Sequence, residues 1–149
     1  MCIRDSAYSD ERGDVLETGG GIHKALPQLG DDPFLVVNAD IYTDMPVPDV
    51  VLADEHLGHL VLVPTPDYRQ RGDFGLDDGL VRNTERPTLT FSGMAIYRPE
   101  LFAGCEAGRF PLAPILREAA DDGSLTGSLY DGLWADIGTS ERLASLSDS

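Results

Sequence analysis

The stretch FLVVNAD, residues 34–40, carries the strongest fold signal in the sequence. Its four leading apolar residues show no alternation with polar ones, which is typical of a strand buried on both faces of a sheet. The run ends at Asp40, and we expect this residue at the rim where open α/β sheets bind their ligands. A carboxylate there can hold Mg²⁺ against phosphate oxygens, or it can close an Asx turn, and the sequence leaves both interpretations open.

Helices and strands are predicted on both sides of this stretch. Upstream, the apolar residues Ile22, Ala25, Leu26 and Leu29 share one helical face, and Gly30 is a suitable stop. Downstream we expect a helix at 50–56, an apolar strand at 60–63, a polar loop at 64–73 and a hairpin at 74–81. The pattern continues with two strand halves at 89–97 around Ser92-Gly93, a helix at 112–120, strands at 125–130 and 133–137, and a capped helix ending at 146.

Strands and helices alternate early in the chain, and hairpins follow later. This order favours an α/β fold with a Rossmann-like, doubly wound mixed sheet. Such a sheet normally opens with a strand, a loop and a helix, whereas the first clear element here is the glycine-rich segment 17–21. We therefore expect a sheet that lacks its first strand–loop–helix units.

Composition and charge exclude several classes of partner. The 149 residues carry 26 acidic and 11 basic side chains, which gives a net charge of −15. Nucleic acid and anionic membrane surfaces both attract basic patches, so we expect neither as a partner. No apolar run approaches the ~20 residues of a membrane span, and the chain start lacks the apolar core of a signal peptide. Cys2 and Cys105 form no paired motif, and a cytoplasmic protein is predicted.

The glycine run Gly19-Gly20-Gly21, ahead of the first predicted helix, is a candidate binding segment. Glycine lets backbone N–H groups approach an anion or a flat ring, and a helix N-terminus adds partial positive charge. Glu17 and Thr18 either hydrogen-bond a base edge or cap the helix. A flexible turn without a ligand is the competing interpretation, because the run is neither a dinucleotide fingerprint nor a Walker loop.

The second acidic candidate is Asp136, in the stretch WADIGT at 134–139. A short strand delivers this carboxylate, and the chain then turns into the last predicted helix. Asp136 is therefore either a second Mg²⁺ ligand or a charge at a helix N-terminus. If Asp40 and Asp136 converge, they supply the one or two carboxylates that Mg²⁺ normally takes besides phosphate and water.

Other reactive residue types form no recognisable constellation. His56 and His59 give H-x-x-H rather than H-E-x-x-H, and we interpret them as solvated residues at a helix end. Ser92 is not in a G-x-S-x-G elbow, and an acidic neighbour disfavours a thiolate at Cys105.

Six motifs occur along the chain in an order that resembles the sugar-1-phosphate nucleotidyltransferase family. They are LETGGGI at 16–22, FLVVNAD at 34–40, GDFGL at 72–76, LTFSG at 89–93, FPLAP at 110–114 and WADIGT at 134–139. Within the family, the series is most similar to the N-acetylmuramate-1-phosphate uridylyltransferase branch of bacterial cell-wall (peptidoglycan) recycling. The resemblance covers residues 12–146.

The resemblance implies an enzyme that makes a nucleoside-diphosphate sugar and pyrophosphate from a nucleoside triphosphate and a sugar 1-phosphate, with Mg²⁺ as cofactor. By position, Asp40 and Asp136 resemble the catalytic pair that holds the metal. The positions that resemble the nucleotide-binding segment are Glu17, Thr18, Gly19 and Gly20. Gly75 and Gly93 resemble backbone positions that face the sugar. Asn38 is also assigned to the sugar site, and by resemblance it supports the loop that holds the metal.

The branch implies UTP and N-acetylmuramate 1-phosphate as substrates. The alternatives are guanylyl transfer to mannose 1-phosphate and thymidylyl transfer to glucose 1-phosphate. A non-catalytic module that binds nucleotide sugars and a pure interaction scaffold are competing functions of other classes.

The family also has a first strand and a glycine-rich, arginine-bearing loop that grip the triphosphate, and nothing similar occurs in this sequence. We therefore expect residues 1–11 to be a non-native or disordered leader. Residues 12–149 are expected to be the C-terminal portion of a single nucleotidyltransferase domain. Such a chain is predicted to be inactive alone, because the triphosphate would lack its Arg and Lys partners.

Overall fold

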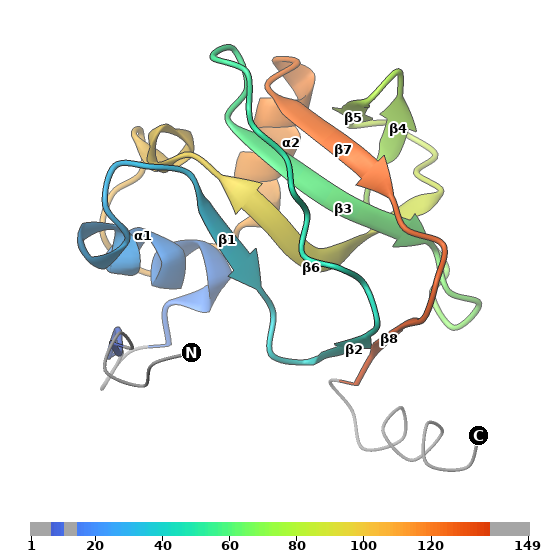
Figure 1. Cartoon of the computed structure of the whole chain (residues 1–149), viewed down its shortest axis with the longest axis horizontal. Helices are drawn as coiled ribbons and strands as arrows, with labels where there is room; N and C mark the ends of the chain where they lie inside the picture. The colour runs from blue at the N-terminus through green and yellow to red at the C-terminus, as the bar shows by residue number, and fades with distance from the viewer. Residues whose placement is uncertain (1–6, 11–14, 138–149) are drawn as a thin grey trace.

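The computed structural model describes residues 7–10 and 15–137. Its elements in chain order are α1 (Glu17–Leu29), β1 (Phe34–Val37), β2 (Ile41–Thr43), β3 (Gly58–Pro64), β4 (Gly75–Asp77), β5 (Leu80–Arg82), β6 (Leu89–Tyr97), η2 (Pro99–Phe102), α2 (Ala113–Asp121), β7 (Leu125–Leu129) and β8 (Trp134–Asp136) (Figure 1). The predicted helix that ends at 146 lies outside the described residues, as does most of the predicted leader.

The strands form a six-stranded mixed sheet and a separate two-stranded ladder. The sheet order is β1-β6-β3-β7-β5-β4; β3 and β7 run parallel, and the other neighbouring pairs are antiparallel. This arrangement confirms the predicted α/β fold with a mixed sheet. The ladder pairs β2 with β8, two short strands from distant parts of the chain, and it was not predicted.

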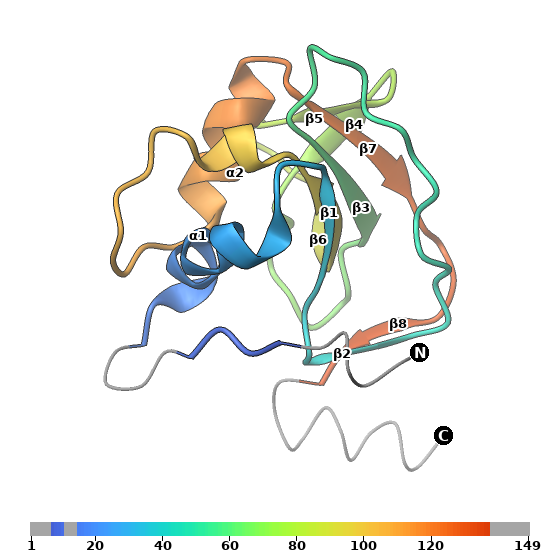
Figure 2. The ribbon, with the colours of Figure 1, turned by 60° about the vertical axis from the view of Figure 1, so that its left-hand side comes forward.

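Helices α1 and α2 pack on the same face of the sheet, where the main core lies (Figure 2). Leu60 and Leu62 of the central strand β3 are fully buried there, in one cluster with Leu116 of α2. Ile22 and Leu26 of α1 pack against the same cluster, which confirms this part of the predicted apolar face, whereas Leu29 is 40% exposed. Neither of these helices has the length and apolarity that crossing a bilayer requires.

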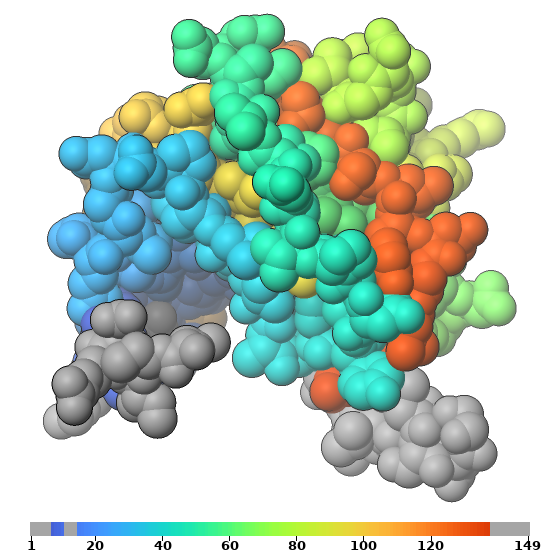
Figure 3. Space-filling model, viewed as in Figure 1, coloured from blue at the N-terminus to red at the C-terminus, as the bar shows by residue number. Residues whose placement is uncertain are grey.

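The opposite face of the sheet is crossed by the segment 44–57, the teal chain that runs between β2 and β3 and covers part of this face (Figure 3). Met45 of this segment packs with Val61 of β3 and Met94 of β6 in a second, smaller apolar cluster. Trp134 of β8 packs against the same cluster, and its indole N–H donates to the carbonyl oxygen of Ser92 at 2.9 Å. The β2–β8 ladder is therefore tied to the sheet through β6.

Residues 50–56 are irregular, so the helix predicted there is wrong. The guanidinium of Arg98, just after β6, donates to the carbonyl oxygens of His56 at 2.8 Å and Leu52 at 2.9 Å. Because a tertiary partner satisfies these carbonyl groups, the segment does not need helical hydrogen bonds. Local apolar spacing could not reveal this partner.

Strand β1 is less buried than its apolar sequence predicts. It is an edge strand of the described sheet and pairs on one side with β6. Phe34 is only 8% exposed, whereas Leu35 and Val37 are 41% and 49% exposed. Successive side chains of a strand point to opposite faces, and the described residues cover only one face of β1 well. The prediction that both faces are buried is therefore wrong for β1, although β3 meets it from Gly58 to Val63.

Strand β6 is continuous from 89 to 97, so the predicted break into two halves is wrong. Its register with β3 shifts instead: Leu62 pairs with Phe91, but Leu60 pairs with Ala95. The extra residues include Gly93, whose φ is 91°, a conformation that favours glycine. A β-bulge of this kind bends a strand without ending it.

His59 is a core residue of β3, and its interpretation as a solvated helix-end residue is wrong. The residue is 5% exposed, and its Nδ1 and Nε2 lie 2.8 and 3.1 Å from the hydroxyl oxygens of Thr126 and Ser128 on β7. Burial lowers the pKa of His59 below its ordinary value, because a charged imidazolium is poorly solvated there. The neutral ring therefore links the two parallel strands.

Candidate functional site

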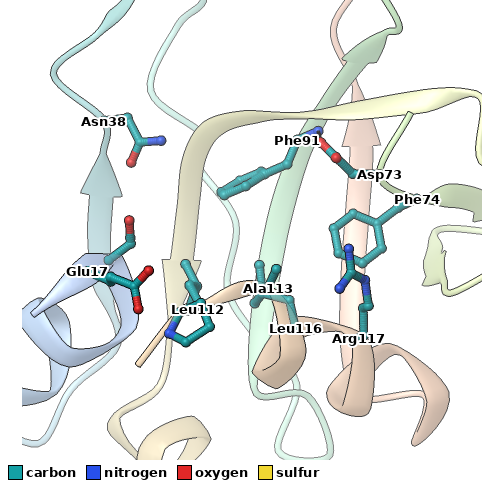
Figure 4. A pocket seen from close by; sticks show the side chains of 11 residues that line it. Glu17, Asn38, Asp73, Phe74, Phe91, Leu112, Ala113, Leu116 and Arg117 are labelled. Atoms are coloured by element: carbon teal, nitrogen blue, oxygen red, sulfur yellow. Dashed lines mark hydrogen bonds between the residues drawn. The ribbon is translucent and has the colours of Figure 1, made fainter. Parts of the chain in front are cut away.

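A cavity of about 430 Å³ lies between the start of α1, the end of β1 and the start of α2 (Figure 4). Its walls combine apolar side chains with a few polar ones, as small-molecule sites do. The lining residues are Glu17, Thr18, Asn38, Asp73, Phe74, Phe91, Pro111, Leu112, Ala113, Leu116 and Arg117. Three residues predicted for the site, namely Glu17, Thr18 and Asn38, are therefore brought to one cavity.

The start of α1 is fixed by the segment 108–110. The N–H of Phe110 donates to the carbonyl oxygen of Leu16 at 3.2 Å, and the N–H of Gly20 donates to that of Phe110 at 3.0 Å. Glu17 has a φ of 60°, a strained conformation for a residue with a side chain, and its carboxylate lies 3.6 Å from Nε of Arg109. Strain that the surrounding structure maintains is common at binding sites.

The glycine run is helical, so the flexible-turn interpretation is wrong. A Cβ on Gly19 would lie 2.6 Å from the Phe110 ring, and one on Gly20 would lie 2.2 Å from the carbonyl oxygen of Gly108. Glycine is therefore required here by the close approach of another segment. Gly19 and Gly20 are not among the lining residues, and their contact with a nucleotide stays a prediction.

Asn38 follows β1 and lies directly against Gly93 of β6. Its N–H donates to the carbonyl oxygen of Gly93 at 2.8 Å. A Cβ on Gly93 would lie 2.9 Å from Nδ2 of Asn38, so glycine leaves the space that the amide occupies. Gly75 is placed differently: it lies in β4 opposite Arg82, and its neighbour Phe74 lines the cavity instead.

The β2–β8 ladder brings together the backbones of the two predicted metal ligands, which are far apart in the sequence. Ile41 pairs with Asp136 in antiparallel register, and the N–H of Ile137 donates to the carbonyl oxygen of Asp40 at 2.8 Å. Asp40 is exposed and Asp136 is half-buried. Asp40 also lies two residues beyond Asn38, so the ladder begins next to the cavity.

Two carboxylates suit Mg²⁺ better than most other metals. Within residues 7–10 and 15–137, no group of three or more His, Cys, Asp or Glu side chains could hold a metal ion. Mg²⁺ needs no such group, because it binds through one or two carboxylates and completes its shell with phosphate and water. Asp40 and Asp136 match this requirement in chemical type and number.

Asp73 and Arg117 line the cavity and were not predicted as site residues. Asp73 accepts the N–H of Phe91 at 2.9 Å and lies 3.4 Å from Arg69, and these contacts fold the loop before β4 back onto β6. In the sequence, only the spacing of four residues between Arg69 and Asp73 indicated that these two side chains could form an ion pair. For Arg117, on the exposed side of a regular amphipathic helix, the sequence offers no such indication.

The surroundings of Ser92 and Cys105 differ from those of activated nucleophiles. Ser92 is fully buried in β6, and its hydroxyl oxygen accepts the N–H of Met94 at 3.2 Å. Burial raises the pKa of the Cys105 thiol, and the charge of Glu118 raises it further. The acidic neighbour that matters is therefore on α2.

The fold matches solved nucleotidyltransferase structures. The crystal structure of HddC from Yersinia pseudotuberculosis complexed with GMP-PN has a TM-score of 0.70 at 19% identity, over 92% of this chain and 64% of that one. The inositol-1-phosphate CTP transferase from T. maritima has a TM-score of 0.67 at 13% identity, over 89% of this chain and 60% of that one. At these identities the likeness shows the fold alone. No protein-family model matches the chain.

Sequence comparison shows the family. Two curated relatives, from Neisseria meningitidis serogroup B (strain ATCC BAA-335 / MC58) and Caulobacter vibrioides (strain ATCC 19089 / CIP 103742 / CB 15), are 45% and 37% identical over 92% and 87% of this chain. The chain belongs to the sugar-1-phosphate nucleotidyltransferase family. Both relatives are N-acetylmuramate alpha-1-phosphate uridylyltransferases. The chain spans 63% and 60% of their lengths.

Proposed function

We propose that this protein transfers a uridylyl group from UTP to N-acetylmuramate 1-phosphate. An oxygen of the sugar phosphate attacks the α-phosphorus of UTP, and the bond from that phosphorus to the bridging oxygen breaks. Pyrophosphate leaves, and the other product is the nucleoside-diphosphate sugar. The family supports the reaction class, and the two curated relatives support the choice of nucleobase and sugar.

The pairing of β2 with β8 is the observation that carries the proposal. It joins the backbone of Asp40 to that of Ile137, next to Asp136, at the point where the chain leaves the cavity residue Asn38. Asp40 and Asp136 would hold Mg²⁺, which when bound neutralises the charge of the reacting phosphates. The protein's own part is positioning, since transfer between phosphates gains most from alignment and charge neutralisation.

The remaining site residues would divide between the two substrates. Glu17 and Thr18 would hydrogen-bond the edge of the nucleobase, and Gly19 and Gly20 would support that helix start. Asn38 would orient the sugar from the position that Gly93 allows, and Gly75 would present its backbone to it. A volume of about 430 Å³ lies in the range of small-molecule sites.

Ligand binding by the 149-residue chain tests the proposal. Mg²⁺ with UDP-N-acetylmuramate should raise the Tm, because a ligand at 100 times its Kd stabilises the folded state by about 2.7 kcal/mol. Asp40→Asn and Asp136→Asn should each lose the Mg²⁺-dependent part of this shift. Asp32→Asn, in the exposed turn before β1, is the matched control and should keep it. A wild-type chain that shows no shift with any nucleotide or nucleotide sugar would support the scaffold and contradict the proposal.

Pyrophosphate release separates an enzyme from a nucleotide-sugar sensor. Release that needs both UTP and N-acetylmuramate 1-phosphate supports the transferase and would contradict the expectation that this chain is inactive alone. A ligand-induced Tm shift without any release is expected both for a chain that is inactive alone and for a non-catalytic module, so only release discriminates, in favour of the enzyme. Parallel assays with GTP and mannose 1-phosphate, and with dTTP and glucose 1-phosphate, test the alternative substrates.

A further inference from the structure

Among the residues that the structure describes, the charged lining of the cavity includes one cation without an ion-pair partner. Three charged side chains line the cavity: Glu17, Asp73 and Arg117. Glu17 is paired with Arg109 at 3.6 Å, and Asp73 is paired with Arg69 at 3.4 Å. Arg117 makes no hydrogen bond or ion pair to any residue that the structure describes. A guanidinium that faces a cavity in this state is available to an anionic ligand.

Helix α2 fixes the backbone position of Arg117, whose side chain is exposed. Leu116, next to it in the sequence, is 2% exposed in the main core, and Ala119 and Ala120 are buried along the same side of the helix. In Figure 4 the guanidinium stands beside Phe74, at the α2 side of the cavity, and Asn38 stands at the β1 side. The guanidinium of Arg117 and the amide of Asn38 would therefore contact different ends of a molecule bound in the cavity.

The proposed reaction determines which end of the substrate reaches each side. Its phosphates belong near Asp40, which follows Asn38 on the β1 side of the cavity, and near Asp136, whose backbone the β2–β8 ladder brings beside that of Asp40. Arg117 lies on the other side, where a second anionic group of the sugar is a better match than the phosphate. N-acetylmuramate has such a group, the carboxylate of the lactyl ether on its O3, and N-acetylglucosamine does not.

We propose that Arg117 binds the carboxylate of an acidic amino sugar and so selects N-acetylmuramate over its neutral counterpart. This inference rests on the proposed function and names the residue that would set its sugar specificity. The planar guanidinium binds a carboxylate through two parallel N–H···O hydrogen bonds. We expect UDP-N-acetylmuramate to bind about 10- to 100-fold more tightly than UDP-N-acetylglucosamine, as one charged hydrogen-bonded contact allows.

Calorimetric titration of the full chain with these two nucleotide sugars, in the presence of Mg²⁺, tests the inference. The two probes differ only in the lactyl group. Arg117→Gln should remove most of the preference and leave the affinity for UDP-N-acetylglucosamine within about 2-fold. Arg117→Lys keeps the positive charge but cannot form the two parallel hydrogen bonds of a guanidinium, so it should retain an intermediate preference for UDP-N-acetylmuramate. Lys24→Gln removes the same charge from the exposed face of α1, away from the cavity lining, and should change neither affinity.

Each contrary outcome overturns a different statement. If Arg117→Gln weakens both nucleotide sugars equally, Arg117 meets their shared phosphates, and the specificity role is wrong. If the wild type binds both equally well, the inference fails while the proposed transferase stands. If the wild type binds neither UTP nor either nucleotide sugar, the proposed function fails and the inference fails with it. Should Arg117→Gln not fold, as its Tm would show, the Arg117→Lys titration decides.

Discussion

Replacing Gly93 with alanine tests how the fold shapes the candidate site. Gly93 has a φ of 91°, and an added Cβ would lie 2.9, 3.0 and 3.1 Å from Nδ2, Cβ and Cγ of Asn38. A left-handed backbone costs a residue with a side chain about 1–2 kcal/mol, and overpacking costs about 1–3 kcal/mol. We therefore expect Gly93→Ala to lower the free energy of unfolding by roughly 2–5 kcal/mol.

Chemical or thermal unfolding measures this loss, and each kcal/mol lowers the Tm of a chain of this size by about 2–4 °C. Gly104→Ala is the matched control: Gly104 is exposed, its φ is not positive, and no atom lies within 4 Å of its added Cβ. It should change stability by no more than about 0.5 kcal/mol. In an Asn38→Ala background the contacts with Nδ2 and Cγ disappear, whereas the 3.0 Å contact with Cβ and the backbone strain stay. Gly93→Ala should therefore cost less there, by part of the about 1–3 kcal/mol of overpacking. If Gly93→Ala is as harmless as Gly104→Ala, the close contact with Asn38 is refuted.

Three further predictions concern the segments around the site. Gly20→Ala should lower the free energy of unfolding by about 3 kcal/mol or more, because the added Cβ would lie 2.2 Å from the backbone oxygen of Gly108. This oxygen cannot move away as a flexible side chain would. A loss under about 1 kcal/mol in urea unfolding would contradict the packing of α1 on the segment 108–110. Stability should fall as the pH drops below about 6.5, by at most about 1.4 kcal/mol per pH unit, because unfolded His59 binds a proton at its ordinary pKa whereas burial lowers the pKa of the folded residue. His59→Gln should flatten this slope, and unchanged slopes in unfolding midpoints measured from pH 7.5 to 5 would oppose this assignment. Asp73→Ala should lower the free energy of unfolding by about 1.5–3 kcal/mol, because the N–H of Phe91 loses a charged acceptor at 2.9 Å. Asp73→Asn keeps an acceptor oxygen and should recover part of this loss in the same assay. Equal losses for the two variants would show that the acceptor oxygen is unimportant.

The fold was predictable where local pattern alone decides it. The uninterrupted apolar run from Leu60 to Val63 is the buried strand β3, and the Gly79 turn closes the predicted hairpin. The run from Phe34 to Val37 has the same local pattern, but it forms an edge strand with one exposed face. The two runs differ in the strands that pair with them. Those strands are distant in sequence, so a window of seven residues cannot reveal them.

The candidate site was predictable in part, through the motif series. That series selected Glu17, Thr18 and Asn38, which meet at one cavity, and the backbone neighbours Asp40 and Asp136. Spacing alone could not have joined these residues, because the β2–β8 ladder is a long-range pairing of two three-residue strands.

Asp73 and Arg117 were missed for a related reason. Asp73 becomes a lining residue only once its loop is bonded to Phe91 of β6, and Arg117 only once Leu116 has fixed the rotation of α2. His59 shows the same limit in the core, since alternation cannot reveal a polar side chain that is buried against hydroxyl groups of a neighbouring strand.

A crystal structure of the protein with Mg²⁺ and UDP-N-acetylmuramate would show whether Asp40 and Asp136 share one metal ion. We expect one ion with a carboxylate oxygen of Asp40 and one of Asp136 each at about 2.1 Å, and with a phosphate of the nucleotide sugar in the same coordination shell. Two carboxylates that point into separate regions, or an ion that contacts neither of them, would contradict it.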